Sequence, residues 1–571
     1  MSQMMNNNRF QPLYLSHLGK NILAKLPYLF LSLFCLVLIS GIFLPVYTDE
    51  VVMKWAISRF FEESGKSLSF FPQCLKTMNV QISWIFYPAA LTYSLIYKYL
   101  FPLGLRISGL VVCFLWLSGI GYWCFKIIKP RQTAAYFLAA LLAASIALGV
   151  MPFNFIMARP EQVLMLILLL SFLYCLFWKN TFSIRMQCLA GLIFILLCSC
   201  FFYIHPQTLF FLPFMMAVAY CISEKGPRLL QAAMLLIPLV LAYKTIQTAH
   251  IMANCEQTPV LNTVLASNTL FPSFLWQSPL EFFKQGFFNL KEVPGKIISY
   301  LVFQPFYQSY WLPSGAEAGI FSHLLNMGIE FVLYLLIIGS HLLAIGVLVY
   351  GLIMRTLTTS IVLGGLLAFG SLGNSFFYKI WNFYGASQFL PLSVMLILSL
   401  PLTTVQNRLS NRINSLSIIL MLFASLSMSF LVGNYLPAMI TNSSTPDADI
   451  SGQYLSMPVF GVKKHIQTLK TLAQECKLST DKVKNLVVDQ MTYYAFKDQS
   501  NPIHVLYISE AGYGQDLTNG RLKPFLTKID SPGLIIRCSY LPPQLGELPR
   551  SEKNGYCCIN LQQLSKTDVK V

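Results

Sequence analysis

Two adjacent carboxylates, Asp49 and Glu50, follow the first long apolar run of the sequence. Asp49 is the only aspartate before Asp447, and an ionisable residue beside an apolar segment is costly enough to need a reason. One reason is chemical, because a carboxylate can take a proton from a hydroxyl group as a general base. The other is structural, because Thr48 or Asp49 would cap a helix predicted over residues 50–63. The sequence leaves both roles open.

Further polar residues stand in short turns between apolar runs. Residues 159–161 form an Arg-Pro-Glu motif in a tight turn, and Lys379 lies in a loop dense in aromatic residues. A surface ion pair or a lipid-headgroup contact would explain the Arg-Pro-Glu motif without a catalytic role, and an aromatic belt with a snorkelling lysine would explain Lys379. His205 lies in another short turn, and a lone histidine is more often structural than catalytic. The candidate site residues are Asp49, Glu50, Arg106, Arg159, Glu161, His205, Lys379, Trp381 and Tyr384.

The composition indicates what kind of elements must position these residues. Hydrophobic residues make up 55% of the 571 and charged residues only 11%, whereas about a quarter of a soluble domain is charged. Lipid must therefore replace water over much of the surface. The net charge of +17 is concentrated in the apolar part, because the tail from residue 434 carries 15 Lys/Arg and 12 Asp/Glu. In the apolar part before residue 434, basic residues stand singly or in pairs, which indicates cytoplasmic loops and argues against nucleic-acid binding.

Apolar runs of about 20 residues, the length needed to cross a bilayer, predict eleven transmembrane helices. Every alternate short loop carries Lys or Arg, which predicts a cytoplasmic N-terminus and an external C-terminus. We interpret the apolar segment 82–100 as interfacial, because a span there would break this alternation. The predicted spans are 27–47, 103–125, 132–151, 162–178, 187–204, 207–222, 229–247, 328–354, 358–376, 386–404 and 413–433.

The predicted protein is therefore an α-helical polytopic membrane protein with a small C-terminal α/β domain outside the cytoplasm. The four cysteines of that domain could form one disulfide in an oxidising compartment. The predicted divisions are a cytoplasmic segment 1–26, a transmembrane domain 27–433 with large extracytoplasmic loops at 48–102 and 248–327, and the α/β domain 434–571. In that domain the pattern predicts a helix at 461–476 and strands at Leu486–Val488, His504–Ile508, Leu534–Ile536 and Tyr556–Ile559.

This topology brings the acidic pair, Arg159, His205 and Lys379 to one membrane face, the extracytoplasmic one. A carboxylate near several cations at that depth suits a reaction of an anionic lipid. The carboxylate would accept a proton from an acceptor hydroxyl. The cations would stabilise the phosphate charge that develops on the leaving lipid.

The order of these motifs resembles the GT-C superfamily of integral membrane glycosyltransferases, particularly the protein-mannosyltransferase and aminoarabinose-transferase types. In this family a first span is followed by an acidic loop with two juxtamembrane helices. The second span then carries an arginine near its outer end, here Arg106. An Arg-Pro-acid turn follows between spans three and four, here at residues 159–161. The resemblance covers about residues 1–430 as architecture.

The resemblance implies transfer of a sugar, with inversion, from a polyprenyl-phosphate donor to a glycan, lipid or protein acceptor outside the cytoplasm. Asp49 would be the catalytic base, and Glu50 would support it or a divalent cation such as Mg²⁺ or Mn²⁺. The cations Arg159, Lys379 and Arg106 would bind the lipid phosphate. The remaining candidates for substrate contact are His205, Glu161, Trp381 and Tyr384. The resemblance leaves the metal ligands undetermined.

Two other classes of function fit the composition. A lipid-linked sugar flippase or solute transporter predicts charges or broken helices at mid-membrane and two related halves. A non-catalytic membrane scaffold predicts that the tail, rather than Asp49, carries the function. The one-sided charges favour the glycosyltransferase, and the bacterial inner membrane, with the site on the periplasmic face, is the expected location.

Overall fold

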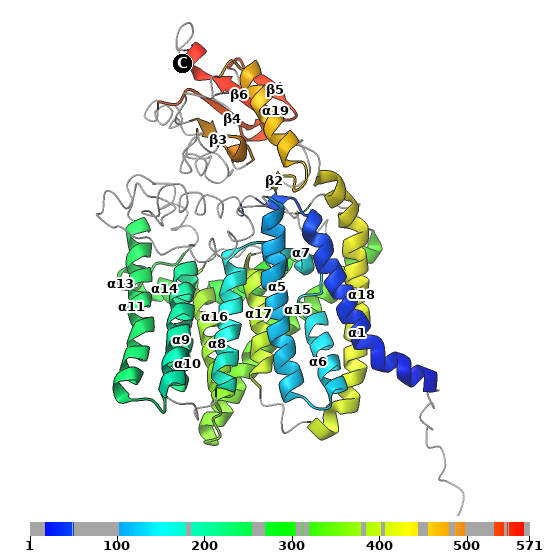
Figure 1. Ribbon diagram of the computed structural model, residues 1–571, viewed down its shortest axis with the longest axis vertical. Coiled ribbons are helices and arrows are strands. Elements are labelled where there is room, and N and C mark those ends of the chain that lie inside the picture. Colours follow the sequence, from blue (N-terminus) through cyan, green and yellow to red (C-terminus); the bar gives the residue numbers. More distant parts are fainter. Residues whose placement is uncertain are drawn as a thin grey trace, which may run out of the picture.

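The computed structural model places a layer of long helices below a small α/β unit (Figure 1). Of the predicted helix 50–63 only Glu50 is described, and the segment 82–100 and the strand His504–Ile508 lie outside the described residues. The structure describes residues 17–47, 50, 102–178, 184–253, 269–303, 312, 319–378, 384–400, 406–443, 455–478, 486–489, 491–496, 499, 530–541, 545 and 548–564.

Long apolar helices run side by side through the membrane part (Figure 1). In the described ranges, nine helices are long and apolar enough to cross a membrane, and each corresponds to one of the eleven predicted spans. The prediction of an α-helical polytopic membrane protein is confirmed. The helices are α1 His17–Ser40, α5 Leu103–Ile127, α6 Arg131–Ala143, α7 Met151–Phe155, α8 Pro160–Phe177, α9 Ile184–Ile204, α10 Leu212–Ser223, α11 Arg228–Ala253, α13 Phe274–Gln277, α14 Pro279–Ser299, α15 Ile320–Ile353, α16 Thr359–Phe377, α17 Tyr384–Leu398 and α18 Gln406–Asn442, with 3-10 turns η1 Gly41–Phe43 and η2 Pro206–Phe211.

The predicted span 132–151 is wrong as a continuous helix. Helix α6 ends at Ala143, residues 144–150 form turns, and α7 follows. Residues 145–160 are all buried, so this irregular backbone is enclosed by protein, the condition under which it is tolerated at membrane depth. The predicted span 386–404 is also shorter, because α17 has 15 residues and ends at Leu398.

Gly149 is essential to the turn between α6 and α7. Its φ of +54° lies in the left-handed region, its amide donates to Ser427 Oγ at 2.9 Å, and the next amide, of Val150, donates to Leu301 O at 2.9 Å. A β-carbon on Gly149 would stand 1.9 Å from the same Leu301 oxygen. This position therefore excludes a side chain by both conformation and space.

Gly149→Ala is expected to destabilise the protein. The left-handed conformation alone costs a non-glycine residue about 1–3 kcal/mol, and the contact with a backbone oxygen cannot be relieved by a rotamer change. Thermal unfolding in detergent should therefore show a clearly lower Tm. The matched control is Gly433→Ala in α18, where a β-carbon meets no atom within 4 Å, and where alanine should be neutral or mildly stabilising. Equal Tm values for the two variants would contradict this account.

Helix α14 belongs to the predicted loop 248–327 and is amphipathic. Phe282 and Val293 are buried, whereas Phe287 and Phe288 are exposed. Asn289 Nδ2 donates to Phe376 O at 2.9 Å, which holds α14 against the C-terminal end of α16. An exposed aromatic face on a helix with lysines suits a position at the membrane interface.

The α/β unit contains a four-stranded sheet in the order β3-β4-β6-β5. Strands β3 and β4 are parallel, and the other neighbours are antiparallel. The predicted helix and three of the four predicted strands are confirmed, and β5 was not predicted. The elements are β2 Leu455–Met457, α19 Val462–Glu475, β3 Val487–Val488, η4 Tyr493–Ala495, β4 Gly533–Arg537, η6 Cys538–Tyr540, β5 Ser551–Lys553, β6 Tyr556–Asn560 and α23 Leu561–Leu564.

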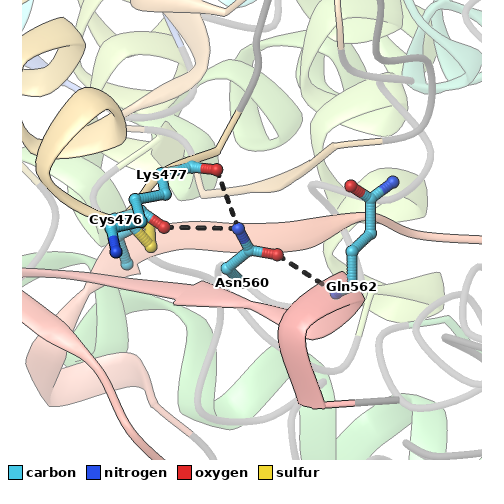
Figure 2. Close-up of a disulfide and its surroundings, with 5 residues drawn as sticks. Cys476, Lys477, Asn560 and Gln562 are labelled. Atoms are coloured by element: carbon cyan, nitrogen blue, oxygen red, sulfur yellow. Dashed lines mark hydrogen bonds between the residues drawn. A yellow bond between two sulfur atoms is a disulfide. The ribbon is translucent and has the colours of Figure 1, made fainter. Parts of the chain in front are cut away.

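The four cysteines of this unit form two disulfides rather than the one predicted. Cys476 pairs with Cys558, and Cys538 pairs with Cys557, so the end of α19 and the end of β4 are both joined to β6. Figure 2 shows the first disulfide beside Asn560, whose Nδ2 donates to Lys477 O at 2.9 Å. The same side chain accepts from the Gln562 amide at 3.1 Å, so it joins the end of α19 to the start of α23.

A two-stranded pairing connects the α/β unit to the helices. Strand β1, Val46–Tyr47, pairs antiparallel with β2, and the rings of Phe43 and Phe460 lie 5.6 Å apart. We call this end of the helix bundle the domain end. The chain segment that leads into the acidic pair is therefore held at the domain end.

Candidate active site

A buried ion pair between Glu50 and Arg106 anchors the site. Arg106 lies in the first turn of α5 and directs its guanidinium back to the segment before the acidic pair. Its Nη1 and Nη2 contact Glu50 Oε1 and Oε2 at 2.5 and 2.7 Å, and neither side chain has any exposed surface. This is the two-pronged arginine–carboxylate geometry, which fixes orientation as well as position.

The same guanidinium also binds main-chain carbonyls. Arg106 Nε donates to Leu44 O at 2.8 Å and Nη2 to Pro45 O at 2.6 Å. The bonds of Arg106 hold Leu44, Pro45 and Glu50 against the start of α5. Four of the five guanidinium N–H groups are bonded within the protein, so Arg106 has at most one left for a lipid phosphate.

The Arg-Pro-Glu turn is joined to this anchor. The Ala158 amide donates to Glu50 Oε1 at 2.8 Å. Gln162 Nε2 donates to Gly109 O at 2.8 Å and to Phe155 O at 2.6 Å, which ties the turn to α5. Gly109 makes this approach possible, because a β-carbon there would lie 1.9 Å from Ile156 O.

Arg159 and Glu161 form a second ion pair at the beginning of α8. Arg159 is the N-cap residue, Pro160 takes the first helical position, and Glu161 lies in the first turn, where its charge is favoured by the helix dipole. Arg159 Nε lies 3.3 Å from Glu161 Oε2, and their side chains are only 10% and 6% exposed. This separation is long for a charged hydrogen bond.

His205 and Tyr378 complete a charged cluster with this pair. His205 precedes η2 and its Nδ1 accepts from the Gln207 amide at 3.1 Å. Burial lowers the pKa of His205 to about 4; the charge of Glu161 opposes this shift and that of Arg159 adds to it. His205 is therefore neutral at pH 7. Burial, assisted by Glu161, raises the pKa of Tyr378, so the phenol keeps its proton.

The structure brings most of the described candidates together at the domain end. Glu50 joins Arg106, and Arg159 joins Glu161 and His205. Asp49, Lys379 and Trp381 lie outside the described residues, and Tyr384 begins α17, with only its backbone described. Sequence reasoning missed Tyr378, although its place directly before Lys379 in the aromatic loop was a usable signal.

One group of side chains in the described part of the chain has the composition of a metal site. Cys538, Glu552 and Cys557 have ligand atoms close enough together to hold an ion. The two sulfurs are joined in a disulfide, and a metal binds the thiolate form of cysteine. These residues therefore do not fit a metal site as they stand.

Comparisons with known proteins give similarity to solved structures alone. No family model matches the chain, and no curated protein matches it. The crystal structure of ArnT from Cupriavidus metallidurans bound to undecaprenyl phosphate is similar with a TM-score of 0.46 and 10% identity, covering 93% of this chain and 97% of that chain. The apo structure of the same protein is similar with a TM-score of 0.40, 10% identity and the same coverage.

Proposed function

We propose that this protein is a membrane glycosyltransferase that moves a sugar from a polyprenyl-phosphate donor to a glycan, lipid or protein acceptor at the domain end. The observation that carries the proposal is the joining of two ion pairs through one short turn. Glu50 binds both Arg106 and the Ala158 amide, and Arg159 is the next residue. This arrangement supports an anion-binding group at Arg159 beside Glu50, the residue that directly follows the proposed base Asp49.

In the proposed reaction the Asp49 carboxylate accepts the proton of the acceptor hydroxyl. The hydroxyl oxygen bonds to the anomeric carbon of the sugar as the bond between that carbon and the lipid phosphate oxygen breaks. The electron pair of that bond leaves with the phosphate, and one displacement inverts the anomeric configuration. Arg159 and Lys379 would stabilise the leaving phosphate.

The other candidates take supporting roles in this proposal. Glu50 and Arg106 would position Asp49 rather than react, because Glu50 already accepts from a guanidinium and an amide. Neutral His205 and protonated Tyr378 can donate hydrogen bonds beside Arg159 without adding charge. The predicted substrate contacts of Glu161, Trp381 and Tyr384 remain proposals, as does a divalent cation near the acidic pair.

The location is also proposed. Two disulfides in the α/β unit support an oxidising compartment for the domain end. The periplasmic face of a bacterial inner membrane meets that requirement and agrees with the alternation of basic loops. The acceptor would then be reached from the periplasm.

Turnover in proteoliposomes tests the proposed function. We expect the purified protein to release free polyprenyl phosphate from one member of a panel of polyprenyl-phosphate sugars. Arg159→Gln should reduce this release by about 10²- to 10³-fold, the usual effect of losing one charge-stabilising donor. The control is Arg131→Gln, an exposed arginine at the start of α6, which should behave as wild type. Equal release by both variants would contradict the assignment of Arg159.

One observation favours a flippase or transporter as the second candidate. The break between α6 and α7 is the kind of discontinuous helix on which transporters build their sites. Transport predicts that a labelled lipid-linked sugar crosses the bilayer intact, without release of polyprenyl phosphate. The same proteoliposomes therefore separate the two functions.

A further inference from the structure

Three buried carboxamides in the helix bundle have polar atoms without hydrogen-bond partners in the described part of the chain. Asn374 in α16 and Gln388 in α17 are 0% and 1% exposed, and both the oxygen and the nitrogen of each amide are unpaired. The Oε1 of Gln207 in η2 is unpaired as well. Burying such a group unpaired costs about 1–3 kcal/mol, so three together call for a bound partner.

Asn374 and Gln388 lie at one level of the bundle. Helices α16 and α17 are joined by a short connection, and a β-carbon on Gly364 would stand 2.0 Å from Ser399 Oγ. Asn374 lies ten residues after Gly364, and Phe389 lies ten residues before Ser399, so both are ten residues nearer the connection. The equal rise of antiparallel helices therefore places Asn374 at the same height as Phe389 and the adjacent Gln388.

Helix α15 supports this alignment independently. His341 Nε2 lies 2.8 Å from Ser371 Oγ on α16, and the His341 ring lies 6.2 Å from the Phe389 ring on α17. Ser371 is three residues from Asn374, so it occupies the neighbouring turn of the same helix. One imidazole thus bridges the two helices next to the level of the amides.

This level is next to the charged cluster. The Tyr378 amide donates to Asn374 O at 3.1 Å, so the two residues are one helical turn apart, and Tyr378 is close enough to Glu161 to be shifted by its charge. Gln207 follows His205 by two residues. Phe210 stands three residues further along the 3-10 turn, on the same face, and its ring lies 6.4 Å from that of Tyr378.

The unpaired atoms limit which partners would satisfy them. Three amide oxygens require donors, and two amide nitrogens require acceptors. A phosphate dianion only accepts, so it would leave the oxygens unpaired. A hydroxyl group both donates and accepts, and a sugar ring carries several hydroxyl groups. Asn374 lies one helical turn from Tyr378 of the charged cluster, so a sugar bound there would be next to that cluster.

We propose that Asn374, Gln388 and Gln207 bind the hydroxyl groups of the donor sugar and set the preference for that sugar. This inference rests on the proposed function. It assigns sugar recognition to α16, α17 and η2, and phosphate recognition to the start of α8. The leaving phosphate and the sugar would then be bound by different elements of the fold.

Thermal shifts with lipids that do or do not carry a sugar test the proposal. The purified proteins are wild type, Asn374→Leu and Gln388→Met, each measured alone, with polyprenyl phosphate, and with a panel of glycosyl polyprenyl phosphates. Without ligand we expect the variants to melt no lower than wild type, because an apolar side chain replaces an unpaired amide. Polyprenyl phosphate without a sugar should raise the Tm of all three proteins equally. The additional rise in Tm that the sugar gives wild type should be smaller in the two variants, because their affinity for the glycosyl lipid falls about 10- to 100-fold.

The control is Asn326→Leu, a buried carboxamide that is fully paired. Its Oδ1 accepts from the Phe303 amide and its Nδ2 donates to Phe303 O, both at 2.8 Å, so this variant should melt lower without ligand and keep the sugar-specific shift. The proposal is overturned if Asn374→Leu and Gln388→Met melt lower without ligand, or if they keep the full sugar-specific shift. If wild type responds to neither lipid, the proposed function fails together with this inference.

Discussion

Asp49→Asn is expected to leave the fold intact and to reduce sugar transfer by about 10²- to 10⁴-fold, the usual contribution of a positioned general base. Asparagine keeps the size and the helix-capping capacity of aspartate but cannot take a proton from the acceptor hydroxyl. The capping role and the catalytic role therefore separate in this variant. Transfer is measured as release of polyprenyl phosphate in proteoliposomes, and folding as the Tm in detergent.

The comparison for Asp49→Asn is Glu281→Gln, an exposed carboxylate in the first turn of α14. It should lose neither activity nor stability, because its contact with Lys284 is a surface ion pair. If Asp49→Asn retained full transfer, Asp49 would not be the base. If instead it lost stability and activity in proportion, the residue would be a helix cap alone.

The second large effect concerns the buried pair of Glu50 and Arg106. Arg106→Leu is expected to destabilise the protein by about 3–5 kcal/mol, because it leaves an uncompensated carboxylate where no solvent reaches it. It also removes the bonds to Leu44 O and Pro45 O, so transfer should fall by more than the loss of folded protein explains. The measurement pairs the Tm in detergent with transfer per folded molecule.

The double variant Glu50→Leu/Arg106→Leu completes a mutant cycle. Removing both charges should recover part of the lost stability, since a buried ion pair is often no more stabilising than an apolar pair. Transfer should stay low, because the chain before Asp49 has still lost its anchors. Arg106→Lys should also perform poorly, because an ammonium cannot reproduce the two-pronged geometry. An Arg106→Leu protein with wild-type Tm and transfer would refute this role.

Local patterns were enough for the elements whose formation depends on neighbouring residues. Nine apolar runs became helices of spanning length in the described ranges, because about 20 apolar residues have one low-energy arrangement in lipid, a helix with all its backbone groups paired. In the tail, the runs at β3, β4 and β6 were predictable because Gly, Pro and Asn turns bound them. Loop positions alone also predicted that Arg159 and His205 lie at one face with the acidic pair and Lys379, and the structure places Arg159 and His205 beside Glu161.

The break after Ala143 shows where such patterns end. Residues 132–151 are as apolar as a continuous span, and nothing local marks an interruption there except Gly149. The turn exists because Leu301 O and Ser427 Oγ accept the amides that a helix would have paired. Those partners lie far along the chain, so the local sequence cannot reveal them.

Composition and periodicity by themselves determined that this chain is a polytopic membrane protein and where most of its described spans begin. The tertiary structure alone decided which charges pair. It joined Glu50 to Arg106 across 56 positions, chose two disulfides among four cysteines, added Tyr378 to the cluster and left Asn374 and Gln388 without partners in the described part of the chain. The physical reason is that the preference for lipid or water is a property of each segment, whereas pairing depends on how segments dock.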